Sequence, residues 1–268
     1  MPIQVTIVGL EQIGASIGLG LKDKTEGMLR VGHDPDPQTA QAAKKLGAVD
    51  RISLNLPAAV EKADLIILAL PVDQVRDTLK VIAADVRKDA VILDTSPLKG
   101  QVLAWAKEIL PAERHFVGLV PVINPAYLNI SQSGVEAARP DLFKGGLFGL
   151  VIPGGVPDAA VKLTLDLTHL LEAEHLFMEE VESDSQIAAL DLLPQLVSSA
   201  LLNMTVGKPG WEEGKKLAGR PYAQATAILN AMDGPQALAS AAIHDQPDVL
   251  RVLDGLIGQL VVIRKLVS

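Results

Sequence analysis

The amino-terminal segment combines a short apolar run, a glycine turn and a helix. Ile3–Val8 reads as a short β-strand that ends at Gly9, and Ile13–Lys24 has the length and apolar spacing of a helix. This order is typical of the βαβ unit that binds dinucleotides, in which the pyrophosphate lies against the helix N-terminus. The segment therefore favours an α/β fold.

The rest of the first half alternates between strand-like and helix-like segments. Asp36-Pro37 is a good helix start and Gly47 a natural helix end. Mostly continuous apolar strands indicate a sheet covered on both faces, and their alternation with helices indicates a parallel sheet. We predict a doubly wound, Rossmann-type parallel sheet over residues 1–153, with further strands at Leu29–Asp34, Leu65–Leu70, Ala90–Asp94 and Phe116–Val120.

From about Val156 onward the pattern is mainly helical. Ile187–Leu202 is apolar on almost all sides, and the last helix carries an apolar stripe from Val249 to Val267. A domain over residues 154–268 is too small to cover that much apolar surface alone. We expect an all-α domain that forms a homodimer through these helices; packing on the first domain alone is the alternative.

Composition argues against several classes of partner and site. The chain has 24 Lys and Arg against 32 Asp and Glu, a net charge of −8, which disfavours nucleic acid and anionic membranes. It has no cysteine, and its 5 histidines are scattered, so we expect no metal site. No apolar run reaches the roughly 20 residues of a membrane helix, and no signal peptide precedes the first strand. We expect a cytoplasmic protein.

The glycine turn departs from the G-x-G-x-x-G pattern at one position. Gly9 and Gly14 are its first and third glycines, and Glu11 replaces the second. Asp34 follows Gly14 by 34 − 14 = 20 residues, where an acid accepts a hydrogen bond from a ribose 2′-hydroxyl and favours NAD over NADP. We predict a cofactor site made of Asp34 and the turn residues Gly9, Leu10, Glu11, Gln12, Ile13 and Gly14.

Glu11 places a negative charge where the diphosphate should approach bare backbone. Two unit charges about 4 Å apart repel by roughly 4 kcal/mol at an effective dielectric near 20. The same carboxylate lies beside a helix N-terminus, which favours an anion. Two interpretations remain: Glu11 turns outward and NAD binds with reduced affinity, or Glu11 mimics the phosphate and closes the site.

Three further segments carry a resemblance to a known family: Ala63–Val72 (A-D-L-I-I-L-A-L-P-V), Leu93–Gly100 (L-D-T-S-P-L-K-G) and Ser133–Gly145 (S-G-V-E-A-A-R-P-D-L-F-K-G). With the glycine turn, the chain resembles the prephenate and arogenate dehydrogenases of tyrosine biosynthesis over essentially its full length. The resemblance implies a homodimer in which NAD(P) accepts a hydride from a cyclohexadienyl carboxylate, whose ring then loses a carboxylate. It also implies that Leu70, Pro71 and Val72 border the nicotinamide.

The departures from the family pattern concern the chemistry. Val120 stands where the family has the histidine that bonds the substrate hydroxyl, and Asp191–Gln195 (D-L-L-P-Q) replaces S-H-L-P-H. Pro97 stands at the family's serine position, next to Ser96. The resemblance leaves as candidate catalytic residues Ser96, Lys99, Asn124, Tyr127 and Arg220. The ordinary alternatives are a surface lysine, a turn-forming Asn-Pro and a packing tyrosine.

Two functions therefore stay open. One is a prephenate-dehydrogenase-like, NAD(P)-dependent oxidoreductase, whose substrate is either a cyclohexadienyl carboxylate of this family or a small molecule other than prephenate and arogenate. The other is a catalytically silent homodimer of the same family that binds a metabolite or a protein. Val120 cannot accept a proton, and a general base contributes about 10² to 10⁴ in rate, so efficient oxidation of prephenate is not expected.

Overall fold

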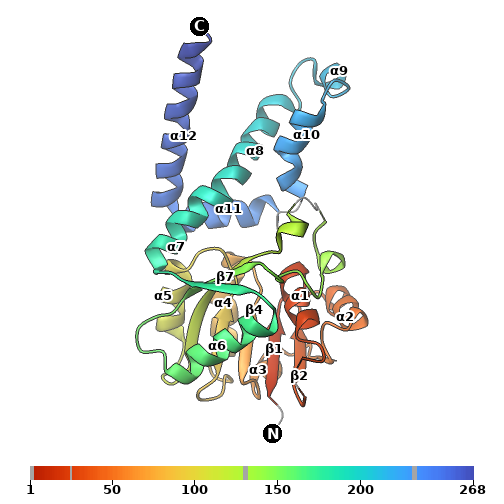
Figure 1. Ribbon diagram of the computed structural model, residues 1–268, viewed down its shortest axis with the longest axis vertical. Coiled ribbons are helices and arrows are strands. Elements are labelled where there is room, and N and C mark those ends of the chain that lie inside the picture. The colour runs from red at the N-terminus through yellow and green to blue at the C-terminus, as the bar shows by residue number, and fades with distance from the viewer. Residues whose placement is uncertain (1–2, 25, 129–131, 231–233) are drawn as a thin grey trace. The chain divides into compact units, whose positions relative to one another are not determined.

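The computed structural model describes residues 3–24, 26–128, 132–230 and 234–268 (Figure 1). The chain divides into two compact units, Met1–Ser183 and Asp184–Ser268. The first unit is an α/β sheet with helices, and the described part of the second is helical.

The first unit is built on an eight-stranded sheet with the strand order β3-β2-β1-β4-β5-β6-β7-β8. All neighbouring pairs from β3 to β6 are parallel, and the order reverses direction at β1, as in a doubly wound fold. The Rossmann-type prediction is thereby confirmed. The strands are β1 (Gln4–Val8), β2 (Leu29–His33), β3 (Arg51–Ile52), β4 (Leu65–Leu68), β5 (Val91–Asp94), β6 (His115–Val122), β7 (Leu147–Val151) and β8 (Glu174–Phe177).

One strand departs from the predicted parallel arrangement. β7 pairs antiparallel with β6, with Val120 opposite Gly149. The physical reason is the connection: its described residues, 123–128 and 132–146, contain only short 3₁₀ turns and none of the crossover helix that a parallel return usually requires. Both ends of this segment therefore lie at the edge where the parallel strands end.

Helices cover both faces of the sheet. Ile7 of β1, Ile67 of β4 and Leu93 of β5 share one buried cluster with Ile17 and Leu167, whereas the alternate strand positions are buried toward the opposite face. This double burial explains why β4 is continuously apolar. In β1, Gln4 and Thr6 are buried as well, and both donate to the carbonyl of Ala59. The helices of this unit are α1 (Gln12–Gly20), α2 (Pro37–Leu46), α3 (Leu56–Val60), α4 (Val72–Ile82), α5 (Gly100–Ile109) and α6 (Asp158–Leu170).

The first unit extends further along the chain than the boundary expected at residue 153. Leu167 of α6 lies in the buried cluster of the sheet, and β8 pairs with β7 from Glu174 to Phe177. Because the strand after α6 adds to the same sheet, residues 154–183 cluster with the first unit. The units divide between Ser183 and Asp184.

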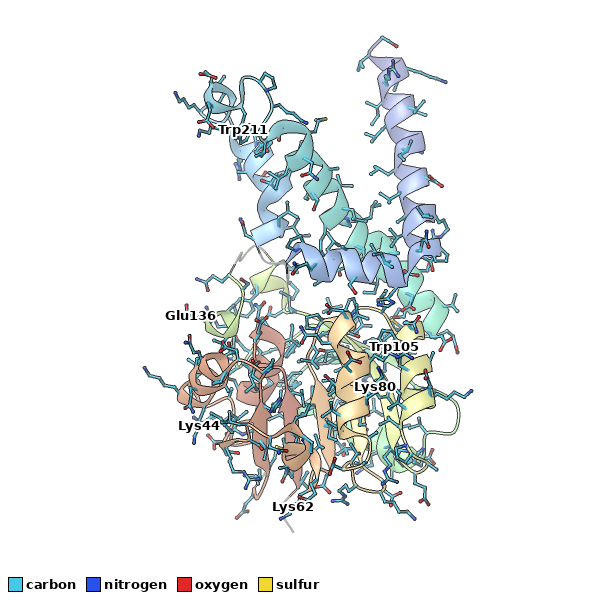
Figure 2. All side chains as sticks on the ribbon, turned by 180° about the vertical axis from the view of Figure 1, so that it is seen from behind. Lys44, Lys62, Lys80, Trp105, Glu136 and Trp211 are labelled. Atoms are coloured by element: carbon cyan, nitrogen blue, oxygen red, sulfur yellow. The ribbon has the colours of Figure 1, made fainter. Side chains whose placement is uncertain are left out.

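The second unit contains a long helix with a widened turn. The helix continues from α7 (Glu180–Ile187) through a π-helical segment, Ala188–Leu192, into α8 (Leu193–Thr205). Pro194 has no N–H to donate to the carbonyl four residues earlier, which accounts for the widening. The other helices are α9 (Trp211–Gly214), α10 (Arg220–Thr226), α11 (Pro235–His244) and α12 (Gln246–Leu266). Trp211 of α9 lies 5.9 Å from Tyr222, ring centre to ring centre (Figure 2).

The second unit leaves much of its apolar surface exposed. Ile257 and Leu260 of α12 keep 56% and 53% of their surface exposed, whereas Val249 at its start is buried. By length and composition alone, the helix Glu180–Thr205 could cross a membrane, which corrects the expectation that no segment is long and apolar enough. It is the single such helix among the described residues, which is weak evidence, and no membrane protein is indicated.

Candidate functional site

The glycine turn after β1 is held by close backbone packing. Gly9 has φ +88°, and a Cβ atom there would lie 2.1 Å from the carbonyl oxygen of Ala69, just beyond β4. A Cβ atom at Gly14 would lie 1.9 Å from the carbonyl oxygen of Gly9. Neither position can therefore hold another residue without moving backbone. The turn presents bare backbone at the switch point of the sheet, which suits a diphosphate.

Asp34 is buried at the carboxyl end of β2, beside this turn. Its Oδ2 accepts a hydrogen bond of 2.8 Å from the backbone N–H of Leu10, and its Oδ1 accepts one of 2.9 Å from the backbone N–H of Asp36. A carboxylate oxygen has two acceptor sites, so these bonds leave capacity for a ribose hydroxyl. The structure thus brings Asp34 and the turn together, as the spacing in the sequence indicates.

Glu11 occupies the N-cap position of α1. Its backbone is extended (ψ −159°), its side chain is exposed, and the carboxylate makes no capping hydrogen bond to the helix. The phosphate-mimic interpretation predicts a hydrogen bond from the N-terminus of α1 to the Glu11 carboxylate, and the structure has no such capping bond. Leu10 packs in the core, and Gln12 and Ile13 are half-buried. Within the turn of residues 9–14, Glu11 is thus the charged residue, and its side chain is exposed.

The end of β4 supplies an apolar wall next to the turn. Leu70 and Val72 are buried, and Pro71 is half-buried at the N-cap position of α4. Gly9 approaches this same segment through Ala69. The three residues therefore lie beside the glycine turn, at the carboxyl edge of the sheet.

Lys99 is fully buried in the turn between β5 and α5. Its Nζ donates to the carbonyl and Oδ2 of Asp94, at 2.8 and 2.9 Å, and to the carbonyl of Ser96 at 2.5 Å. The hydroxyl of Ser96, also buried, donates to the same Asp94 oxygen at 2.7 Å. The three N–H groups of an ammonium thus each have an acceptor from the chain itself. Lys99 is therefore not the surface lysine of the alternative interpretation, and it is not exposed to a substrate in this conformation.

Asn124 and Tyr127 are held in the segment after β6. The Asn124 side chain accepts from the backbone N–H of Ala126 at 2.9 Å and donates to the carbonyl of Asp141 at 3.3 Å. The Tyr127 hydroxyl donates to Oδ1 of Asp141 at 2.7 Å, and this bond raises the pKa of Tyr127. A raised pKa makes Tyr127 a weaker candidate for a general base.

The remaining candidates divide between the two units. Val120 is half-buried near the end of β6. In the second unit, Arg220 is exposed at the start of α10, Leu192 is buried, and Gln195 donates to Asp191 at 3.2 Å. The two family histidine positions thus hold an apolar side chain and a carboxamide. Among the residues the structure describes, no group of three or more His, Asp or Glu is placed to hold a metal ion.

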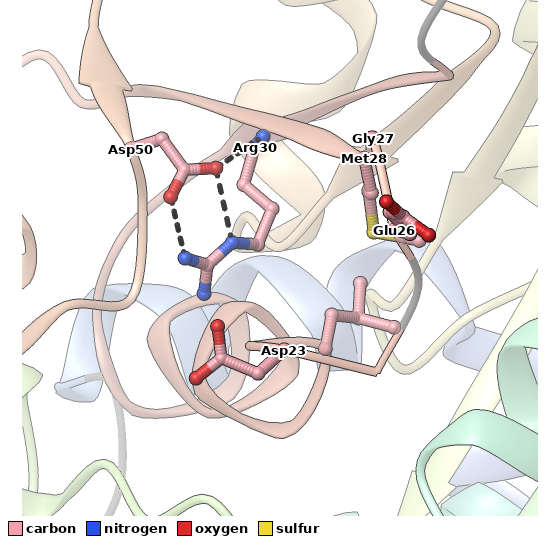
Figure 3. A pocket seen from close by; sticks show the side chains of 7 residues that line it. Asp23, Glu26, Gly27, Met28, Arg30 and Asp50 are labelled. Carbon is pink, nitrogen blue, oxygen red and sulfur yellow. Dashed lines mark hydrogen bonds and ion pairs between the residues drawn. The ribbon is translucent and has the colours of Figure 1, made fainter.

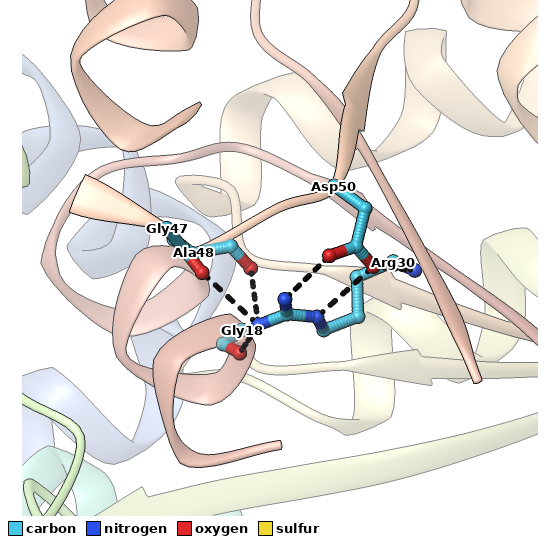
Figure 4. A network of polar contacts seen from close by, with 5 residues as sticks. All are labelled: Gly18, Arg30, Gly47, Ala48 and Asp50. Atoms are coloured by element: carbon cyan, nitrogen blue, oxygen red, sulfur yellow. Dashed lines mark hydrogen bonds and ion pairs between the residues drawn. The ribbon is translucent and has the colours of Figure 1, made fainter. Parts of the chain in front are cut away.

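A hollow of about 380 Å³ lies at the amino end of β2, at the edge of the sheet opposite to the glycine turn (Figure 3). Arg30, which borders it, donates from Nη1 to the carbonyls of Gly18, Gly47 and Ala48, and from Nε and Nη2 to the carboxylate of Asp50 (Figure 4). The guanidinium is thus committed to the ends of α1 and α2 and is not available to a ligand. The hollow is lined by Leu21, Asp23, Glu26, Gly27, Met28, Arg30 and Asp50.

This network is not predicted from the sequence, although a charged residue inside a strand candidate is a usable signal. The buried side chain of Arg30 ties the second strand to two helix ends. Gly18 was missed as well: a Cβ atom there would lie 2.2 Å from the carbonyl of Ala48. Both features position α1, whose N-terminus forms the glycine turn.

A glycine turn at the switch point, followed by an acid at the end of the next strand, defines a dinucleotide-binding α/β unit. The family model described as prephenate dehydrogenase, nucleotide-binding domain, matches residues 17–174. The chain belongs to the prephenate dehydrogenase family. The matched residues begin after Gly14, so the turn that carries Glu11 lies outside them.

Known relatives and structures agree with this assignment. The chain is 27% identical to prephenate dehydrogenase of Bacillus subtilis over 98% of its own length and 70% of that protein. It is 23% identical to cyclohexadienyl dehydrogenase of Zymomonas mobilis, over 98% and 88% of the two chains. The fold is similar to that of A. aeolicus prephenate dehydrogenase in complex with hydroxyphenyl propionate and NAD+, with a TM-score of 0.86, 22% identity and coverage of 100% and 91%.

Proposed function

We propose that the protein is an NAD-dependent oxidoreductase that acts on a small carboxylic acid, either a cyclohexadienyl carboxylate or a related compound other than prephenate and arogenate. The observation that carries the proposal is the glycine turn whose Leu10 N–H is bonded to buried Asp34. Prephenate and cyclohexadienyl dehydrogenases among the relatives support the substrate class. Asp34 favours NAD because its carboxylate repels a 2′-phosphate.

The chain's residues would hold the cofactor along the carboxyl edge of the sheet. Asp34 would accept from the adenosine ribose, and the backbone of Gly9–Gly14 would receive the diphosphate at the N-terminus of α1. Pro71 and the end of β4 would border the nicotinamide. When bound, NAD supplies the acceptor for a hydride.

The residues that surround this edge supply little for proton removal. Val120 has no proton acceptor, the ammonium of Lys99 is bonded within its own turn, and the hydroxyl of Tyr127 is bonded to Asp141. A substrate whose oxidation depends on a histidine at position 120 is therefore disfavoured. The same observation supports the second candidate function, a catalytically silent member of the family that binds a metabolite or a protein.

We further propose a cytoplasmic homodimer formed through the second unit. The exposed apolar side chains of α12, including Ile257 and Leu260, are the support for the dimer, since exposed patches of this kind mark association surfaces. The chain has no cysteine and hence no disulfide that requires an oxidising compartment.

Calorimetric titration with NAD, NADH and NADP tests the cofactor. We expect NAD to bind at least about tenfold more tightly than NADP, a difference of about 1.4 kcal/mol. Equal or tighter binding of NADP would contradict the role of Asp34. Binding of NAD without NADH production from a panel of cyclohexadienyl and hydroxy acids would favour the silent relative.

A further inference from the structure

The buried pair of Lys99 and Asp94 lies near the position where the proposed function places the nicotinamide. Asp94 ends β5 and pairs with Leu68 of β4, which in turn pairs with Val8 of β1. A dinucleotide that lies on Asp34 and on the turn after β1 continues along the same edge toward β4 and β5. The turn of residues 95–98 therefore lies toward the nicotinamide end.

The ion pair fixes this turn more tightly than an apolar pair would. Lys99 cross-links its own turn because its Nζ reaches both Asp94 and the carbonyl of Ser96. A buried ion pair adds little net stability compared with well-packed apolar residues. Its effect here is on geometry, because directed hydrogen bonds fix the shape of the turn. In the described part of the chain, Oδ1 of Asp94 is buried without a hydrogen-bond partner. An unsatisfied buried oxygen destabilises the fold, which points to a role other than stability.

The neighbouring strand leaves room for this arrangement. A Cβ atom at Gly118 of β6 would lie 2.7 Å from Cδ of Lys99, too close for both to stay in place. Gly118 pairs with Asp94 across β5 and β6. The position of the lysine stem thus depends on a glycine from a second strand.

We propose that Lys99 and Asp94 are positioning residues that hold the turn of residues 95–98 in the shape that receives the nicotinamide half of NAD; this inference rests on the proposed function. Neither residue contacts the substrate. Their effect is confined to the nicotinamide half, because Asp34 and the glycine turn receive the adenosine and the diphosphate.

Comparison of NAD with ADP-ribose tests this role, because ADP-ribose keeps the adenosine and the diphosphate and lacks the nicotinamide. The charge-balanced double variant Lys99→Met/Asp94→Asn avoids leaving one buried charge unpaired. We expect it to raise the Kd of NAD at least about tenfold and to change that of ADP-ribose by less than about twofold. Isothermal titration of both ligands measures the ratio.

Two further variants keep the test decisive. Arg30→Met/Asp50→Asn removes a second ion pair, between buried Arg30 and the more exposed Asp50 at the amino end of β2, and should lower the melting temperature without changing the ratio of the two Kd values. Gly118→Ala displaces Lys99 without removing a charge, and should shift the ratio in the same direction by a smaller factor. Gly118→Ala carries the test if the charge-balanced variant does not fold.

The outcomes separate the inference from the proposed function. Selective weakening of NAD by the variants at Asp94, Lys99 and Gly118 supports the inference. Equal weakening of both ligands, no weakening, or equal affinity of the wild type for both ligands overturns it, while the proposed cofactor site stands. Failure of the wild type to bind either ligand contradicts the proposed function and removes the inference with it.

Discussion

Oδ2 of Asp34 accepts a 2.8 Å hydrogen bond from the backbone N–H of Leu10. The acid at the end of β2 therefore holds the turn after β1, and in the proposed function it also accepts a hydrogen bond from the adenosine ribose. Asparagine at this position keeps one carbonyl acceptor and loses the charge. The two roles can therefore be separated by a conservative substitution.

We expect Asp34→Asn to weaken NAD binding by about tenfold and to reduce the preference over NADP, because the repulsion of a 2′-phosphate is lost. Parallel titrations with NAD and NADP measure both effects. Asp36→Asn is the matched control, since Asp36 is an exposed helix cap that accepts from Gln38 and Thr39. An unchanged NAD-to-NADP ratio in Asp34→Asn would show that Asp34 serves only the turn.

Glu11 should weaken NAD binding through its charge and its size. Glu11→Gly is expected to gain about 5- to 1000-fold in affinity, equivalent to about 1–4 kcal/mol, and Glu11→Gln should recover only the electrostatic part. Added backbone entropy of glycine opposes the gain by about 0.5–1 kcal/mol. Titration at two salt concentrations checks the charge, because salt screens an exposed carboxylate. Tight wild-type binding that Glu11→Gly leaves unchanged would mean that the side chain points away from the diphosphate.

Val120 should limit turnover of prephenate and arogenate. We expect NADH production by the wild type to lie orders of magnitude below a typical kcat near 10 s⁻¹. Val120→His alone should not restore it fully, because Leu192 and Gln195 occupy the positions of two further family histidines. Stopped assays with both substrates check this. Ordinary wild-type turnover would point to another base, and Tyr127→Phe would then be the first variant to measure.

Asp245, between α11 and α12, should make the stability of the second unit depend on pH. Asp245 is 9% exposed, and its pKa is raised from an ordinary 3.8 to about 6, mainly by this burial. The negative charges of Asp248 and Asp184 contribute to the rise in pKa, whereas Arg251 opposes it. The folded state then binds more protons than the unfolded state between these values. The contribution is fully present below about pH 4 and is lost as pH rises toward and through 6.

Asp245→Asn should remove this loss and stabilise the protein by about 1–3 kcal/mol at pH 7–8. Chemical denaturation of both proteins from pH 4 to 8 gives the difference curve. Subtracting the two curves cancels the contributions of the other carboxylates. One of these is Glu172, whose pKa is lowered to about 2 by two lysines and whose contribution to stability therefore changes with pH in the opposite direction. A difference that does not change between pH 4 and 7 would refute the raised pKa.

The apolar face of α12 should drive association. Sedimentation of the wild type at micromolar concentration is expected to give about twice 28.3 kDa. Leu260→Glu should shift the equilibrium toward the monomer because it places a charge in an apolar interface. Leu54→Glu is the control: Leu54 in the first unit is also exposed, at 69%. A monodisperse wild-type monomer would exclude the dimer.

Much of the fold can be predicted because its signals are local. Apolar runs mark β4 and the first three residues of β5, and β1 is rich in β-branched residues. Asp36-Pro37 and Gly47 mark the ends of α2 as the structure has them. The direction of β7 could not be predicted, because an antiparallel strand buried on both faces has the same apolar pattern as a parallel one. The sequence from His175 to Met178 is strand-like, but the pairing of β8 with β7 is long-range and extends the first unit.

The site was predictable to the extent that spacing encodes it. Gly9, Gly14 and Asp34 follow a fixed spacing, and the structure brings them together. The burial of Lys99 could not be predicted, because a lysine is ordinarily exposed. Only the folded turn shows its Nζ bonded to the carbonyls of Asp94 and Ser96. The role of Arg30 depends on carbonyls from two helix ends, which no sequence pattern specifies.

The antiparallel direction of β7 has a consequence for how this fold can change. The segment from Ile123 to Gly146 leaves and re-enters the sheet at the same edge, and Ser16 of α1 anchors it by accepting from the N–H of Arg139 at 3.0 Å. Insertions or replacements within this segment shift no strand register. This one excursion can thus change in length or sequence while the sheet that carries the glycine turn is inherited unchanged.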